Sequence, residues 1–485
     1  MTIRKVTNRS STITVNSGAV SDSDNTSTGA FDMPSGTTAQ RPGSANSGMT
    51  RFNSETGSLE FYDGTTWVVT NLIPNVDSVT GIIVDGISTS LTLALTNATD
   101  TITVVFKEGG ATLDTVSNVS VSSGSATVST TANVHGSSGS QVGDTISISV
   151  QNVDGTPSGN AVTKVVLDAP SGGATSDSGG YRTHTFTSTT NFTVASGSSI
   201  TGAEMFIVAG GGSGGCHSGG GAGAGGLLWY SGTTVDGKSP NASGVTIGAG
   251  THVCTVGAGA ARGPTGGEYT SYTGWRTDQP SGTLNNTGNT GAGAGRDGGD
   301  SSIAISGGST YTAIGGGGAG YYGCNGYDGG SGGAGGRSAL GGSGTSGQGN
   351  NGGRGHASGS TGQPYPAGGG GGAKQGGAAG TNSEGGDGGA GYNFSSIFGT
   401  SVGDSGNFAG GGGGNMQDSP ADPGEGGTGG GGGGGAGSGS AGASGAANTG
   451  GGGGGNQYNA ARANHSQGGS GFIAIRYQLS NVGAV

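Results

Sequence analysis

The sequence predicts a mainly β protein with a small N-terminal β module, an immunoglobulin-like β-sandwich and a C-terminal glycine-rich domain of packed extended helices. Glycine supplies 122 of the 485 residues, about a quarter of the chain where ~7% is usual. Before residue 170, apolar and polar residues alternate with the period of two that is typical of strands. After it, about one residue in three is glycine, and strand-like segments at 184–194, 203–212 and 470–479 bracket the glycine runs. This bracketing favours a folded domain over a disordered tail.

Composition excludes several classes of protein. Charged residues make up 9% of the chain and the net charge is −11, whereas nucleic-acid binding needs clustered lysine and arginine. No run of 18 apolar residues exists, and the N-terminus lacks the apolar core of a secretory signal. Collagen is excluded because proline occurs only 12 times and glycine falls in solid runs. We therefore expect neither nucleic acid nor membrane insertion.

The N-terminal region divides into an extended attachment arm, residues 1–30, and a small β module, residues 31–72. Two strand-like runs, 49–53 and 58–62, are joined by 54–57. A second turn at Asp63-Gly64 precedes a third run, 67–69. Asp-Gly between apolar runs is a strong hairpin signal.

Three short motifs lie in order along this module. They are P-x-G-T-T-A-Q-R-P at 34–42, G-M-x-R-F-N at 48–53 and F-Y-D-G-T-x-W at 61–67. Together they resemble a small module that recurs in bacteriophage virion and tail-fibre proteins. The resemblance implies attachment to a virus particle, through residues that include Arg41, Pro42, Phe52, Phe61, Tyr62 and Trp67.

Residues 73–170 are predicted to form the β-sandwich. Alternating runs lie at 91–98, 101–108, 116–130, 144–153 and 161–167, with turn signals between them. Strands at this spacing are typical of an immunoglobulin-like domain. Such a domain serves as a rigid spacer or as a binding module, and we favour the spacer. Residues 171–180, rich in serine and glycine, are predicted to be a linker before the glycine-rich domain at 181–485.

The longest glycine runs favour an unusual kind of core. An extended threefold helix of the polyproline II type makes no internal hydrogen bonds, so its amide and carbonyl groups need partners elsewhere. Without Cβ atoms, many such helices can pack together and bond to one another. We therefore predict a domain of polyglycine II helices whose core is backbone, built from runs at 315–318, 368–372, 410–414, 429–435 and 450–455.

Three segments of this region, 203–212, 301–318 and 468–477, resemble the glycine-rich domains of phage tail-fibre proteins and tip adhesins. The resemblance implies a stacked sandwich of polyglycine helices whose distal loops recognise the host surface. It also implies a homotrimer, localisation to the virion after assembly in the host cytoplasm, and contacts with other tail or baseplate proteins.

Large side chains gather between the glycine runs, at 268–286, 321–328, 363–367, 392–398, 415–425 and 456–467. Aromatic rings mixed with amides and carboxylates suit a host-envelope glycan or an outer-membrane protein loop. The alternative is that the aromatic residues cap the ends of the bundle. The candidate binding residues are Tyr269, Tyr272, Trp275, Arg276, Tyr321, Tyr322, Tyr327, Tyr365, Tyr392, Phe394 and Tyr458.

Signals for chemistry are weak, and we expect neither an enzyme nor a cofactor. The pattern G-x-S-x-G occurs three times, about as often as chance gives in so glycine-rich a chain. Buried free thiols are favoured over a metal site for the cysteines, Cys216, Cys254 and Cys324.

Two other functions stay open. One is a head fibre, neck fibre or capsid decoration protein with a role in assembly or loose adhesion. The other is a polysaccharide depolymerase, which would need a carboxylate pair drawn from Glu268, Asp278, Asp418, Asp422 and Glu425.

Overall fold

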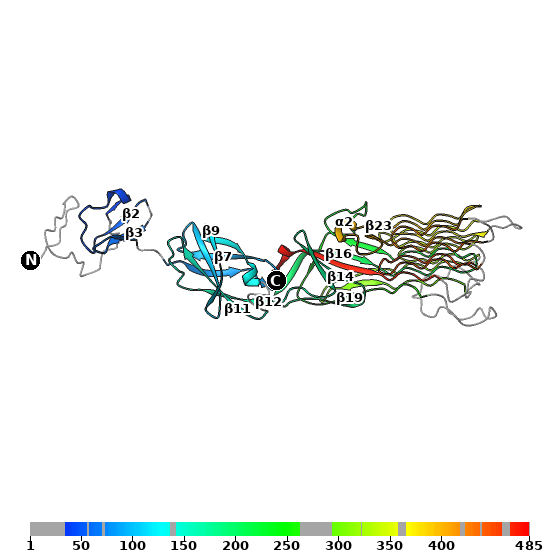
Figure 1. Ribbon diagram of the computed structural model, residues 1–485, viewed down its shortest axis with the longest axis horizontal. Coiled ribbons are helices and arrows are strands. Elements are labelled where there is room, and N and C mark those ends of the chain that lie inside the picture. The colour runs from blue at the N-terminus through cyan, green and yellow to red at the C-terminus, as the bar shows by residue number, and fades with distance from the viewer. Residues whose placement is uncertain are drawn as a thin grey trace, which may run out of the picture. The chain divides into compact units, whose positions relative to one another are not determined.

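The computed structural model is mainly β, with strands over 37% of the chain and helices over 4% (Figure 1). Two compact units divide the chain, Met1–Leu72 and Ile73–Val485. The structure describes residues 34–55, 58–69, 73–135, 142–261, 293–321, 323–356, 365–417, 422–436, 439–457 and 466–484.

The first unit is a four-stranded sheet in the order β1-β2-β3-β4. Asp63 closes the β3–β4 turn by accepting hydrogen bonds from the amides of Thr65 and Thr66, at 2.7 and 2.8 Å. The predicted hairpin strands are confirmed. The elements are β1 (Ser35–Gly36), a 3-10 turn (Thr38–Gln40), β2 (Thr50–Asn53), β3 (Ser58–Tyr62) and β4 (Trp67–Val69).

The second unit begins with eight strands in one hydrogen-bonded path, β5-β7-β10-β9-β8-β11-β12-β6. The path curls until β5 lies against β11 and β12, and alternate residues such as Leu91, Leu93 and Leu95 fill a core inside it. The predicted run 116–130 is two strands, because Ser123 and Gly124 turn the chain with φ of 49° and 73°. The elements are β5 (Asn75–Thr80), β6 (Ile83–Val84), β7 (Ser90–Thr96), β8 (Thr101–Glu108), β9 (Ala111–Ser122), β10 (Ser125–Ser129), α1 (Ala132–His135), β11 (Thr145–Asn152) and β12 (Val162–Leu167).

The predicted linker at 171–180 is wrong. Ala174–Ser178 forms strand β13, which pairs with β14 (Tyr181–Phe186) across a two-residue turn. Gly179 and Gly180 make that turn with φ of 58° and 80°, the geometry of a tight hairpin. All side chains of β13 are exposed, so the strand carries no apolar signal and its composition mimics a linker.

Two further sheets form the base of the glycine-rich region. One has the order β13-β14-β26-β16-β17, with β18 and β27 also paired to β16, and the other has the order β15-β19-β20-β21. The predicted run 184–194 therefore contributes to both sheets. The remaining strands are β15 (Thr190–Val194), β16 (Ser198–Val208), β17 (Leu227–Tyr230), β18 (Val245–Ile247), β19 (Gly250–Thr255), β20 (Ser301–Ala304), β21 (Thr310–Ala313), β26 (Phe472–Gln478) and β27 (Val482–Ala484), with a 3-10 turn at Leu479–Asn481.

Strand β16 separates two hydrophobic cores. Met205 and Ile207 face a core shared with β15, β19 and β20. Phe206 and Val208, one residue along, face an aromatic cluster with Trp229. Both faces of this strand are buried because successive side chains point to opposite sides.

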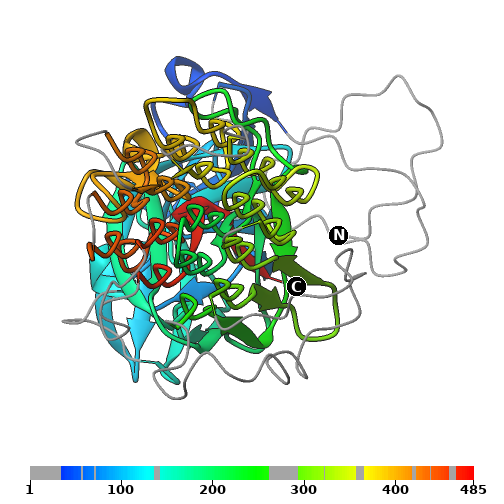
Figure 2. The ribbon, with the colours of Figure 1, turned by 90° about the vertical axis from the view of Figure 1, so that its right-hand side faces the viewer.

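The strands continue directly into extended glycine-rich segments, which we call the glycine array (Figure 1). Its described segments lie between residue 209, after β16, and residue 471, before β26, and exclude strands β17 to β21 of the base sheets. Figure 2 views these segments along their length, as small coils lying side by side. We call the end that joins the strands the sheet end and the opposite end the far end. The array contains β22 (Tyr365–Pro366), β23 (Tyr392–Asn393), α2 (Ser395–Phe398), β24 (Asn407–Phe408) and β25 (Met416–Gln417).

Backbone hydrogen bonds in the array follow a period of three. In the segment 219–226, the amides of Gly220, Gly223 and Gly226 bond to the carbonyls of Gly320, Gly317 and Ile314, at 2.8–2.9 Å. The amides of Gly221 and Ala224 bond to a second segment, and those of Ala222 and Gly225 bond to a third. The carbonyl groups of 219–226 accept hydrogen bonds from three further segments. This segment therefore has six hydrogen-bonded neighbours, drawn from 209–215, 314–320, 331–334, 368–371, 412–415 and 450–453.

Candidate functional site

The far end of the array is held by backbone contacts between segments distant in sequence. The amide of Cys216 donates to the carbonyl of Gly293 at 2.9 Å, and that of Asn456 donates to Gly215 at 2.7 Å. Asn415 donates to Gly219 at 3.2 Å. These contacts bring segments from the whole array to one end.

A buried polar group closes this end. The side-chain amide nitrogen of Asn456 donates to the carbonyl of Gly215 at 3.1 Å and to Ser466 Oγ at 3.2 Å. Its oxygen accepts from the amides of Gly442 and Ser466, at 3.1 and 3.2 Å. Asn456, Gln457 and Ser466 are at most 1% exposed. The edges of the predicted loop 456–467 therefore belong to the array, where Asn456 joins three segments.

Several described residues that border undescribed stretches of the sequence lie at the far end. His356 donates to the carbonyl of Pro366 at 3.1 Å, and Ala367 donates to that of Asn415. Segments thus leave and re-enter the array at this end on both sides of 357–364. The register of the backbone bonds places the described neighbours of 418–421 and 458–465 there as well.

Two predicted binding residues lie at the far end. Tyr321 follows Gly320, whose carbonyl accepts from Gly220. Tyr365 lies on β22, and the Arg337 guanidinium stacks 3.8 Å from the centre of its ring, a favourable cation–π arrangement. Tyr327 is bonded through its backbone to Gly318 and Gly333 along the array, with a half-buried side chain. The sequence predictions for Tyr269, Tyr272, Trp275, Arg276, Tyr322 and Tyr458 lie outside the described residues.

The prediction that Phe394 contacts a host surface is wrong. Its side chain is fully buried at the sheet end, 4.4 Å from Phe206 and 5.3 Å from Trp229 between ring centres. Tyr392 lies on the neighbouring strand β23 and packs partly against the same cluster. The alternative interpretation, that aromatic residues cap the bundle, describes these two residues.

Sequence reasoning missed non-aromatic residues near the far end. Leu340 is 57% exposed, and its amide is held by Asn325 Oδ1 at 2.9 Å. Arg337 and His356 also lie there, as the contacts above show. All three occur in stretches with few aromatic residues. The one signal in the sequence is Leu340, a single large apolar residue among glycines and small residues.

The residues predicted for attachment surround a buried charge cluster in the first unit. Glu60 is fully buried and accepts from Arg41 at 2.6 Å and approaches Arg51 at 3.2 Å. The hydrogen bonds from Arg41 hold the pKa of Glu60 below its usual value, although burial opposes them. Arg51 lies 6.0 Å from the ring centre of Trp67.

The remaining predicted attachment residues lie nearby. Tyr62 and Trp67 have ring centres 5.6 Å apart, Phe61 pairs with Thr50 across the hairpin, and Pro42 follows Arg41. Phe52 is 38% exposed beside Leu59, its cross-strand partner at 40% exposed. These two form an exposed apolar spot on the hairpin.

Neither metal binding nor a membrane span has support among the described residues. No three histidine, cysteine or acidic side chains in this part of the chain lie close enough to share a metal ion. The three cysteines are buried and none forms a disulfide, and burial raises the pKa of Cys254 to about 12, which keeps this thiol from the thiolate form that binds metals. No described helix is long and apolar enough to cross a bilayer.

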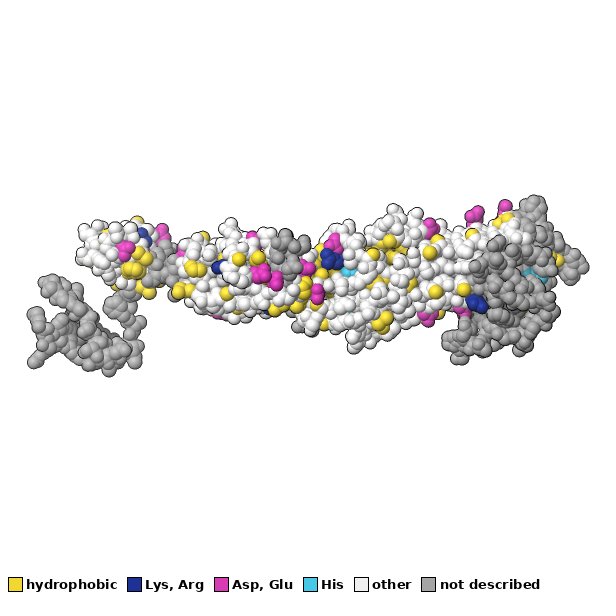
Figure 3. Space-filling model, turned by 60° about the horizontal axis from the view of Figure 1, so that its bottom comes forward, with side chains coloured by type: hydrophobic (Ala, Val, Ile, Leu, Met, Phe, Trp, Pro, Cys, Tyr) yellow, Lys and Arg dark blue, Asp and Glu magenta, His cyan; other side chains and the backbone are white. Residues whose placement is uncertain are grey.

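The surface of the glycine-rich region is mostly uncharged on the face drawn in Figure 3. Comparison with known proteins adds no guide: no family model matches the chain, and no curated protein or solved structure matches it.

Proposed function

We propose that the glycine array is a bundle of polyglycine II helices. The threefold period of its backbone bonds is that of this helix, which has three residues per turn and rises ~3.1 Å per residue. Six neighbours around 219–226 correspond to hexagonal packing of such helices. Within 219–226 every glycine keeps φ outside the left-handed range, as a single helical hand requires.

We propose that the chain is a phage tail fibre or adhesin, in which this bundle carries the residues that recognise the host cell. The observation that carries it is the gathering, at the far end, of segments that flank several of the aromatic-rich stretches of the sequence. A backbone-bonded bundle is rigid, and binding residues are commonly carried on loops positioned by a rigid scaffold. Several copies on one particle would turn weak contacts into firm adsorption.

The other parts receive supporting roles in this proposal. The N-terminal module attaches the chain to other tail or baseplate proteins, and its exposed Phe52 and Leu59 offer apolar area for that contact. The immunoglobulin-like region at 73–170 acts as a spacer. A homotrimer is the assembly that we propose from the resemblance to tail fibres.

Competition for adsorption tests the proposal. Purified chain, added to host cells before phage, is expected to reduce adsorption, and a Trp275→Ala/Arg276→Ala variant is expected to compete less well. A Gln151→Ala variant in the spacer should compete as the parent does. Failure of the parent chain to compete at saturating concentration would exclude host recognition.

Labelling the first unit on intact particles separates tail from head. An antibody against residues 34–69 is expected to decorate the tail or baseplate in electron micrographs. Decoration of the capsid or neck would overturn the tail-fibre proposal in favour of a head fibre or decoration protein.

A further inference from the structure

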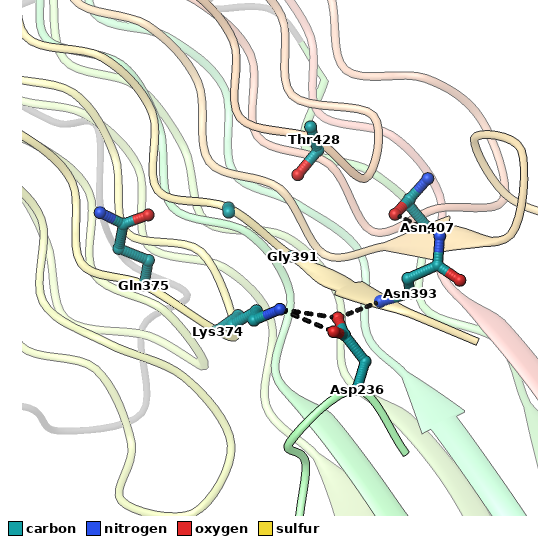
Figure 4. A pocket seen from close by; sticks show the side chains of 8 residues that line it. Asp236, Lys374, Gln375, Gly391, Asn393, Asn407 and Thr428 are labelled. Atoms are coloured by element: carbon teal, nitrogen blue, oxygen red, sulfur yellow. Dashed lines mark hydrogen bonds and ion pairs between the residues drawn. The ribbon is translucent and has the colours of Figure 1, made fainter. Parts of the chain in front are cut away.

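A pocket of about 580 Å³ opens on the flank of the array, near the sheet end (Figure 4). This volume lies within the range of small-ligand sites, roughly 300–1,000 Å³. The pocket is separate from the far end and contains none of the predicted binding residues. Its lining comes from five stretches of chain: Asp236, Lys374 with Gln375, Ala390 with Gly391 and Asn393, Asn407, and Thr428.

Local structure fixes the charged side of the pocket. Asp236 occupies a tight turn with φ of 49°, followed by Gly237 at 81°, so its carboxylate projects from the β17–β18 connection. Lys374 Nζ donates to both carboxylate oxygens, at 2.8 and 2.9 Å. The amide of Asn393 donates to one of them at 2.9 Å. The carboxylate is thus bonded to two separate segments of the array, through Lys374 and through Asn393 on β23.

The opposite sides of the pocket carry uncommitted hydrogen-bonding groups. Gln375 and Thr428 are exposed, and within the described part of the chain neither side chain has a hydrogen-bond partner. Asn407 is held in place, since its oxygen accepts from Asn393 Nδ2 at 3.0 Å and its nitrogen donates to the Asp404 carbonyl at 2.9 Å. In Figure 4, Gln375, Lys374, Asn407 and Thr428 surround Gly391.

These features select the chemistry of the ligand. The charges of Asp236 and Lys374 cancel, so the pocket holds no spare charge for a phosphate, a carboxylate or a cation. Amide, hydroxyl and carboxylate groups together both donate to and accept from hydroxyl groups. Gly391 contributes no side chain to the pocket, because a Cβ there would meet the backbone of Phe408.

We infer that this flank pocket binds a neutral sugar unit of a surface polysaccharide. The inference rests on the proposed function of host recognition and assigns to it a second contact, made by the side of the fibre. Asp236 and Asn407 would orient the sugar hydroxyls, and Gln375 and Thr428 would supply the selective hydrogen bonds. A fibre with such a site would hold a long polysaccharide along its flank while the far end engages its own receptor.

Binding of the full chain to a broad array of neutral and acidic glycans tests this site, followed by calorimetry with the best neutral oligosaccharide. We expect neutral glycans to bind and a Gln375→Ala/Thr428→Ala variant to lose at least about tenfold in affinity. Neither residue makes a side-chain bond within the described chain, so the variant should melt with the parent. The Gln151→Ala variant should bind as the parent does.

The Trp275/Arg276 variant of the adsorption experiment distinguishes this inference from the proposed function. Trp275→Ala/Arg276→Ala should weaken competition for phage adsorption yet keep the glycan affinity measured by calorimetry. The pocket inference is overturned if no neutral glycan binds, if acidic glycans are preferred, or if the flank variant binds unchanged. Each of these results leaves the adsorption experiment to decide the proposed function independently.

Discussion

A Cβ atom placed on Gly221 would lie 1.9 Å from the carbonyl oxygen of Gly412, far inside van der Waals contact. Gly412 belongs to a neighbouring segment whose own amide bonds to Ala222. The obstacle is hydrogen-bonded backbone, which cannot rotate aside as a side chain can. The close approach of these two segments is therefore possible only without a side chain at residue 221.

Gly221→Ala is accordingly expected to destabilise the glycine-rich region by at least about 1–3 kcal/mol, the usual cost of overpacking. Gly433→Ala is the matched control, because a Cβ there meets nothing closer than 3.9 Å although residue 433 also lies within a glycine run. The control should be neutral or slightly stabilising, since alanine reduces the freedom of the unfolded chain. Thermal unfolding of both variants measures the difference, and equal melting temperatures would contradict a backbone core.

Sequence patterns predicted the strands that carry side-chain cores more accurately than the surfaces. The alternation in 203–212 is confirmed as β16, since period two directs Met205 and Phe206 to opposite cores. Strand β13 was missed because an edge strand with exposed polar side chains leaves no apolar period.

The candidate site was harder to predict, because aromatic content does not separate a surface residue from a core residue. Phe394 and Tyr365 come from similar aromatic stretches, yet one is fully buried at the sheet end and the other lies at the far end. The end at which a stretch lies depends on the direction in which the preceding segment crosses the array. The glycine runs vary in length, so the number of crossings before a given stretch cannot be counted from the sequence.

Buried histidines should make stability depend on pH. His184 Nδ1 lies 2.7 Å from the Gly172 carbonyl, to which it can only donate, and Nε2 lies 3.0 Å from Tyr477 Oη, which can donate to it when the ring is neutral. Burial lowers the pKa of His184, and nearby Arg182 lowers it further, although the Gly172 bond and Asp177 act in the opposite direction. The unfolded chain therefore takes up the proton first as pH falls.

The contribution of His184 to the free energy of unfolding is thus fully present above the pKa of the unfolded chain, about 6.5. It falls as the pH drops below that value, by up to about 1.4 kcal/mol per pH unit. Burial also lowers the pKa of His252, which adds to the same trend. Melting temperatures from pH 8 to 5 measure the effect, and a His184→Gln variant should show a smaller decline. A melting temperature that rises as the solution is acidified would refute the assignment of a neutral buried ring.

The charge cluster of the first unit should be sensitive to loss of Glu60. Glu60→Gln leaves Arg51, whose side chain is 6% exposed, without its counter-charge, and uncompensated buried charges cost on the order of 3–5 kcal/mol. Glu55→Gln is the control in the same module, because Glu55 is exposed and is bonded at the surface by the Thr38 side chain and by the Thr38 amide, the latter at 3.0 Å. Hydrogen exchange of β2 and β3 should accelerate in the Glu60 variant alone. Equal protection in both variants would show that the cluster does not stabilise the module.

Phe394→Ala tests whether this ring belongs to the core or to a recognition surface. Removing a fully buried phenylalanine should cost about 3–5 kcal/mol, because Phe206 and Trp229 cannot close the cavity without moving β16 and β17. Tyr365→Ala, at the far end, should show the opposite pattern, with weaker competition for phage adsorption and a nearly unchanged melting temperature. Both variants are compared by thermal unfolding, and then by adsorption competition at a temperature where each is folded. A Phe394 variant that melts with the parent but no longer competes would return this residue to the binding surface.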